Sequence, residues 1–151
     1  MQAFACDLDG TLISSDGLVR DRTRAAIGRA QSAGVPVLIA TGRMFRSVER
    51  YLDDVGLPEP VVCYQGAAVV DPRTRTFLLH EPLALEVARE AIVALAAVGI
   101  SPNVYVDDQL YVAEESQYTR RYSVFQRLPV VSVGDLLAWL ERPPTKLVAV
   151  A

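Results

Sequence analysis

The chain has few of the features that mark several other classes of protein. Its 151 residues include one histidine, one lysine and two cysteines, and the net charge is only −3. So weak a charge gives no support to a nucleic-acid groove or an acidic tail. No apolar run approaches membrane-spanning length, and no basic segment precedes a signal-like apolar core. The sequence therefore predicts a cytoplasmic protein that binds neither nucleic acid nor membrane.

The two cysteines, Cys6 and Cys63, lie in apolar segments typical of strands. A cysteine in that setting is usually a buried free thiol, so a disulfide or a metal pair is not expected. Hydrophobic residues make up 51% of the chain, which is ample for a core. At this length the chain can form one ordinary domain, or one domain and a fragment of another.

The first 80 residues alternate between strand and helix patterns. Apolar runs predict buried strands over 3–7, 35–40 and 61–64, and apolar residues at helical spacing predict helices over 21–33 and 44–55. Segments 68–70 and 76–79 flank a Pro-containing polar stretch, 71–75, that favours a hairpin. The order strand–helix–strand–helix–strand predicts an α/β fold with a parallel sheet and right-handed crossovers.

The pattern changes at Glu81-Pro82-Leu83, which we interpret as a linker. Beyond it, helices are expected over 85–98, 116–125 and 134–140, and strands over 103–106, 110–113 and 146–150. Asp107-Asp108-Gln109 has the composition of a tight hairpin turn. The change in pattern predicts two parts of the chain, residues 1–80 and an α+β segment over 81–151. The core candidates of the second part include Tyr105, Tyr111, Tyr118 and Tyr122.

The most informative stretch is Asp7-Leu8-Asp9-Gly10-Thr11-Leu12. At the end of a strand, positions i and i+2 point to one face, and a turn opened by Gly10 lets both acids and several backbone N–H groups converge. Two such close carboxylates stay ionised only with a cation between them, which indicates a hard divalent metal, Mg²⁺, with room for phosphate. The alternative is an ordinary acidic turn.

A second phosphate-type signal, Ala40-Thr41-Gly42-Arg43, closes the next predicted strand. Ligands of open α/β sheets bind outside the carboxyl ends of the strands, where both signals fall. Arg43 comes in the first turn of a helix, where a cation opposes the helix dipole. That cost suggests that Arg43 binds substrate phosphate or an acid of the second part. A solvated surface arginine is the alternative.

The first of these motifs resembles the first motif of the haloacid dehalogenase (HAD) superfamily of phosphohydrolases. Ile39-Ala40-Thr41-Gly42-Arg43 resembles the second motif in the form used by the Cof-type sugar-phosphate phosphatases. The resemblance runs over essentially the whole chain, with Gln65 at a position where that family usually has Asn. It implies a Rossmann-like HAD core with a parallel sheet over 1–80, followed by part of an inserted α+β cap over 81–151.

The resemblance also implies residue roles. Asp7 is the family's nucleophile, which forms an aspartyl-phosphate and binds Mg²⁺ through its other oxygen. Asp9 is the general acid and base, and its backbone carbonyl is a further metal ligand. The hydroxyl of Thr41 and the N–H of Gly42 hold phosphoryl oxygens. The phosphate-binding set expected as a whole is Leu8, Gly10, Thr41, Gly42 and Arg43.

The family's third-motif lysine and fourth-motif acidic pair are not visible after residue 80, and the lone Lys146 lies in an apolar strand pattern. We therefore expect the N-terminal portion of a Mg²⁺-dependent phosphomonoesterase for small phosphorylated metabolites such as sugar phosphates, inactive by itself. The alternatives are a non-catalytic fragment that binds phosphate or a partner, and a phosphoryl-transfer relative such as a phosphomutase.

An apolar sheet edge left open would favour self-association of the chain.

Overall fold

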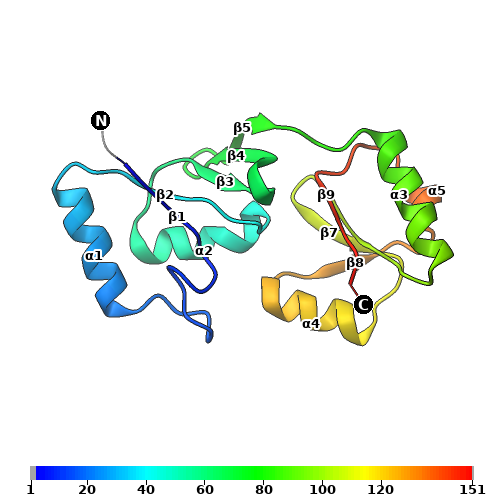
Figure 1. The fold of residues 1–151 in the computed structure, drawn as a ribbon, viewed down its shortest axis with the longest axis horizontal. Coiled ribbons are helices and arrows are strands. Elements are labelled where there is room, and N and C mark those ends of the chain that lie inside the picture. The colour runs from blue at the N-terminus through cyan, green and yellow to red at the C-terminus, as the bar shows by residue number, and fades with distance from the viewer. Residues whose placement is uncertain (1–2, 151) are drawn as a thin grey trace. The chain divides into compact units, whose positions relative to one another are not determined.

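The computed structural model describes residues 3–150, and the chain divides into two compact units, Met1–His80 and Glu81–Ala151. Figure 1 labels most of the elements of each unit. The first unit contains β1 (Phe4–Cys6), α1 (Asp21–Ser32), β2 (Val37–Ile39), α2 (Phe45–Val55), β3 (Val61–Cys63), the 3₁₀ turn η1 (Tyr64–Gly66), β4 (Ala68–Asp71) and β5 (Thr76–His80). The second contains α3 (Leu85–Ala97), β6 (Asn103–Val106), β7 (Gln109–Val112), α4 (Gln117–Gln126), β8 (Val130–Ser132), α5 (Leu136–Trp139) and β9 (Lys146–Val148).

The first unit is built on a short parallel sheet. β1 pairs with β2 in parallel, with Cys6 opposite Ile39. A parallel bridge between Ala40 and Val62 continues the sheet to β3, and β4 and β5 then add antiparallel strands. The predicted α/β fold is confirmed, and the carboxyl ends of the three parallel strands meet at one edge, where ligands of such sheets bind.

Helix α2 contributes most of the buried helical surface in this unit. Its buried side chains include Phe45, Val48 and Leu52, which recur at the three- and four-residue spacing of one helix face. Gly56 ends the helix with φ of 64°, a left-handed conformation that glycine adopts without a Cβ clash. α2 begins at Phe45, shortly after β2 ends at Ile39, so its first turn follows the loop at the carboxyl end of β2.

The structure corrects the prediction that the first strand is buried. Among the described residues β1 pairs only with β2, so it lies at an edge of the sheet. Phe4 is 60% exposed and Cys6 is half-buried, whereas Cys63 is a buried free thiol as predicted. An apolar run indicates a strand, but burial also needs a neighbour on both sides.

The second unit is a four-stranded sheet in the order β8-β7-β6-β9, antiparallel except for the β7–β8 pair. Figure 1 shows α3 and α5 close together beside this sheet. Its core joins those helices to β6 through Ala88, Ile92, Val104, Val106, Leu136 and Leu140. Asp107 and Asp108 have φ of 49° and 54°, which confirms the predicted tight hairpin turn.

Two details of the second unit differ from prediction. The sequence does not predict β8, because three residues after a proline carry too little pattern to indicate a strand. Tyr105 is buried, as expected of a core residue, but Tyr118 is 43% exposed on α4.

Within residues 3–150, none of the helices has both the length and the apolar character needed to cross a bilayer.

The packing predicts that each unit depends on its own core. Leu140→Ala should lower the free energy of unfolding of the second unit by about 2–5 kcal/mol, because Leu140 is 1% exposed and its removal leaves a cavity. Hydrogen exchange should show faster amide exchange in residues 85–148 and unchanged exchange in 4–80. Val124→Ala, at a position 75% exposed, is the matched control. Equal acceleration in both units would show that they unfold together.

Candidate active site

The two sequence motifs meet at the carboxyl edge of the parallel sheet. The N–H of Ala40 donates to the carbonyl of Cys6 over 2.9 Å, so the residues that follow β1 and β2 leave the sheet side by side. Asp7 is exposed directly after β1, and Thr41 is buried directly after Ala40. The predicted placement of Asp7 and Thr41 at the same edge therefore agrees with the strand register.

The loop after β1 is fixed by Leu8. Its side chain is fully buried, and its carbonyl accepts hydrogen bonds from the N–H groups of Thr11, Leu12 and Ile13. This anchor leaves Asp7 and Asp9 exposed on either side of it. Gly10 takes φ of 74° in the turn, but its N–H donates to the carbonyl of Ile13 over 3.0 Å. In this conformation the Gly10 N–H, predicted to face phosphate, is used within the loop.

A bidentate ion pair joins the two motifs. Arg43 donates from Nε to Oδ2 of Asp9 over 2.8 Å and from a terminal nitrogen to Oδ1 over 2.6 Å. Arg43 is only 5% exposed, and its guanidinium carbon lies 5.8 Å from the centre of the Tyr51 ring. The alternative of a solvated surface arginine is therefore wrong. Arg43 binds an acid, and that acid is Asp9 of the first unit.

The pair decides which oxygens face a ligand. Both carboxylate oxygens of Asp9 are engaged by Arg43, while the exposed Asp7 carboxylate lies at the strand end. Within residues 3–150 no three His, Cys, Asp or Glu side chains are grouped as a metal site. Mg²⁺ is commonly held by one or two carboxylates together with water and substrate phosphate. The oxygen donors present are compatible with Mg²⁺ held through Asp7.

The loop after β2 is held from both sides. The N–H of Arg43 donates to Oγ1 of Thr41 over 3.2 Å, so this hydroxyl closes the turn. From the turn after β3, the N–H of Tyr64 donates to the carbonyl of Arg43, and the N–H of Gln65 donates to the carbonyl of Thr41. α2 starts two residues after Arg43, so its N-terminal N–H groups add positive potential at this edge.

The strand and helix patterns of the sequence do not place Gln65 at this loop, although the family resemblance marks position 65 as one where Asn is usual. A methyl group placed on Gly42 would come within 3.2 Å of both Cδ and Nε2 of Gln65, so the carboxamide lies directly against Gly42. The signal that could have located it is weak, because Gly66 marks a turn after the third strand but not the loop that the turn contacts.

Lys146 belongs to the sheet of the second unit. It lies opposite Tyr105 in the β6–β9 pair, and its ammonium is 6.0 Å from the centre of the Tyr105 ring. Burial lowers the pKa of Lys146, since the charged ammonium loses hydration there. These contacts account for Lys146 as a half-buried residue of the strand.

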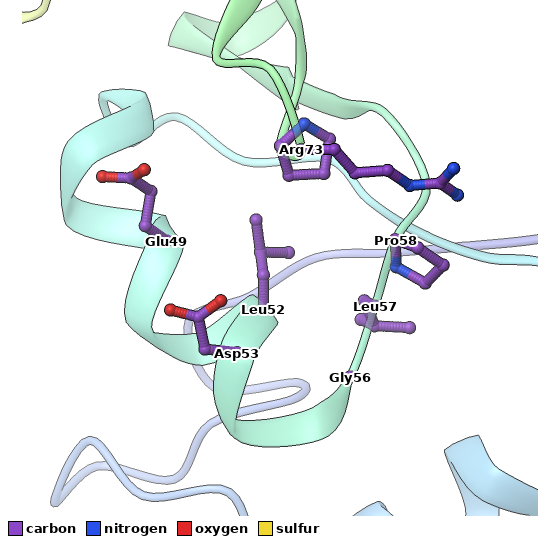
Figure 2. Close-up of a pocket in the computed structure, with 8 residues that line it drawn as sticks. Glu49, Leu52, Asp53, Gly56, Leu57, Pro58 and Arg73 are labelled. Carbon is purple, nitrogen blue, oxygen red and sulfur yellow. The ribbon is translucent and has the colours of Figure 1, made fainter.

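A separate hollow of about 430 Å³ lies at the C-terminal end of α2, remote from the helix start that adjoins the motifs. Figure 2 shows Glu49 and Asp53 on one face of the helix, with Arg73 of the β4–β5 turn across the hollow. Glu49 already pairs with Arg75 over 2.7 Å. The hollow therefore has no part in the chemistry of Asp7 and Asp9.

The motifs, their register and the sheet order agree with one protein family. The sequence profile of the haloacid dehalogenase-like hydrolases matches residues 4–149. The chain belongs to this family. Its fold is also that of solved members: a haloacid dehalogenase-like hydrolase from Bacteroides thetaiotaomicron aligns with a TM-score of 0.87 at 18% identity, over 99% of this chain and 58% of that one. A protein from Thermotoga maritima aligns with a TM-score of 0.83 at 25% identity, over 99% and 56%.

Curated relatives are named as phosphatases. The 5-amino-6-(5-phospho-D-ribitylamino)uracil phosphatase YwtE of Bacillus subtilis is 36% identical over 111 residues, which are 73% of this chain and 37% of YwtE. The pyridoxal phosphate phosphatase YbhA of Escherichia coli is 29% identical over 129 residues, which are 85% of this chain and 47% of YbhA. The chain thus spans half or less of the length of these relatives.

The burial of the two partners predicts an asymmetric effect on stability. Asp9→Asn should lower the free energy of unfolding by about 3 kcal/mol, because it removes the carboxylate from the buried Arg43 guanidinium. Arg43→Met should cost only about 1 kcal/mol, because the Asp9 side chain is 39% exposed and water can solvate it. Urea unfolding of both variants and of the double variant measures the coupling between them.

The exposed pair of Arg20 and Asp16 supplies the control, since its side chains are 59% and 46% exposed. Arg20→Met should leave the urea midpoint unchanged. A larger loss of stability for Arg43→Met than for Asp9→Asn would contradict the asymmetry argued from burial.

Proposed function

We propose that the chain carries the nucleophile and phosphate-binding loops of a Mg²⁺-dependent phosphomonoesterase that acts on small phosphorylated metabolites. The observation that carries the proposal is the exposed Asp7 carboxylate beside the Thr41–Gly42 loop and the start of α2. A carboxylate next to N–H donors suits attack on a phosphoryl group. The named substrates of YwtE and YbhA are both phosphorylated small molecules, which supports this substrate class.

The proposed reaction has two steps. In the first, a carboxylate oxygen of Asp7 attacks phosphorus and the bond from phosphorus to the leaving alcohol breaks, while Asp9 gives its proton to the leaving oxygen. In the second, water attacks the aspartyl-phosphate, Asp9 takes a proton from it, and inorganic phosphate leaves with Asp7 restored. Mg²⁺ held through Asp7 would supply positive charge to the phosphoryl group. Thr41 and Gly42 orient the phosphoryl oxygens.

Asp9 must loosen from Arg43 to perform its role. Both oxygens of the Asp9 carboxylate accept charge-assisted hydrogen bonds from Arg43, so both are occupied. Delivery of a proton to the leaving oxygen requires that at least one oxygen be released. We therefore propose that the Asp9 side chain exchanges one Arg43 contact for substrate during each turnover.

A non-catalytic phosphate binder is the second candidate. The observation that favours it is the ion pair with Arg43, which occupies both carboxylate oxygens of Asp9, the proposed acid and base. Such a chain would keep the phosphate contacts of the Thr41 loop but turn over substrate near background. The two candidates differ in whether Asp7 forms a bond to phosphorus.

Beryllofluoride, a phosphoryl mimic that bonds to an aspartate carboxylate, tests the nucleophile directly. With Mg²⁺ present, the chain should show a bound ¹⁹F NMR signal that Asp7→Asn abolishes, because an amide cannot supply the oxygen. Asp9→Asn should keep the signal, and in the intact enzyme it should lower hydrolysis of p-nitrophenyl phosphate by about 10²-fold or more. Asp53→Asn, at the far end of α2, is the matched control. Phosphate binding with no bound ¹⁹F signal would support the second candidate instead.

We also propose that the open edge of β1 favours self-association. β1 has one described strand neighbour, and an apolar hollow of about 200 Å³ lined by residues such as Phe4, Cys6 and Ile27 lies beside it. Unpaired edge N–H and C=O groups together with apolar side chains promote pairing between chains.

A charge at this edge should suppress the association. Sedimentation velocity should show concentration-dependent oligomers for the native chain and a shift to monomer for Phe4→Lys, because a lysine on an edge strand disfavours pairing. Phe125→Lys, on an exposed position of α4, should leave the oligomers unchanged. A native chain that stays monomeric at every concentration would refute the proposal.

A further inference from the structure

The turn after β3 holds a backbone conformation that its residues rarely adopt. Tyr64, Gln65 and Gly66 have φ of 54°, 55° and 101° in succession. Positive φ suits glycine and is uncommon for a tyrosine or a glutamine, whose Cβ atoms crowd the backbone. Strain of this kind persists where the surroundings enforce it, and it gathers at functional sites.

Contacts with the Thr41–Arg43 loop enforce this conformation. The N–H of Tyr64 donates to the carbonyl of Arg43 over 3.0 Å, and the N–H of Gln65 donates to the carbonyl of Thr41 over 3.1 Å. Tyr64 is only 3% exposed and anchors the turn, while Gln65 is exposed. Two backbone hydrogen bonds therefore attach the turn to the loop, and Gln65 is exposed.

The carboxamide of Gln65 lies against Gly42. Its Cδ and Nε2 atoms would both be 3.2 Å from a methyl group on Gly42, so a side chain at position 42 would push the carboxamide aside by a few tenths of an ångström. Gly42 is the residue whose N–H is proposed to hold a phosphoryl oxygen. The carboxamide thus lies beside the loop that is proposed to hold the phosphate.

We propose that Gln65 contacts the substrate, its carboxamide N–H₂ donating a hydrogen bond to an oxygen of the phosphate monoester. This inference rests on the proposed function. If only the backbone turn mattered, glycine would satisfy the left-handed conformation without strain. The glutamine adds a neutral donor, which favours a phosphate oxygen without placing another charge beside the Arg43–Asp9 pair.

Substitutions at position 65 separate the side chain from the backbone. Gln65→Gly should raise the melting temperature, because it relieves the positive φ, and yet weaken the binding of inorganic phosphate with Mg²⁺ by about 10-fold. Gln65→Glu should weaken phosphate binding by about 100-fold, because a carboxylate repels the phosphate. Both affinities are measured by NMR titration of the full chain.

Arg127→Gly is the matched control, since Arg127 is an exposed residue with φ of 53° at the end of α4. It should raise the melting temperature and leave phosphate affinity unchanged. Unchanged affinity in Gln65→Gly, with native binding intact, would overturn the role of Gln65 alone. Absence of both phosphate binding and the beryllofluoride signal in the native chain would overturn the proposed function and this inference with it.

Discussion

The ion pair between Arg43 and Asp9 is the interaction on which the geometry of this edge depends. It connects the loop after β1 to the loop after β2. Its two hydrogen bonds fix the plane of the Asp9 carboxylate and its distance from the Arg43 guanidinium. β1 and β2 have only three residues each, so the hydrogen bonds between these strands do little to fix the loops that follow them. The buried guanidinium therefore sets how the Asp7 and Thr41 loops face each other.

This pair also changes the electrostatic argument for a metal. Two carboxylates separated by one residue repel each other, and the sequence suggests a divalent cation as the remedy. Arg43 already supplies a positive charge to Asp9, so the repulsion is relieved in part by the protein itself. The case for Mg²⁺ then depends on Asp7 and on the charge of a bound phosphate, where a hard cation has oxygen donors from both.

The two units differ in how completely they are packed. In the second, α3 and α5 cover one face of the sheet and bury Val104 and Val106 almost fully. In the first, α2 is well packed but β1 lies at an edge with Phe4 largely exposed. Asp7 and Asp9, which are proposed to do the chemistry, follow this edge strand. The buried Leu8 side chain and the ion pair with Arg43 are therefore needed to position them.

The sequence by itself determined the order of strands and helices, the tight turn at Asp107–Asp108, and the position of Asp7 and Thr41 at strand ends. These features are local, because periodicity and turn residues act over a few positions. Only the tertiary structure decided that Arg43 binds Asp9, 34 positions away, that β1 is an edge strand, and that Gln65 lies against Gly42. Each of these depends on which segments pack together, and no short window of sequence contains both partners.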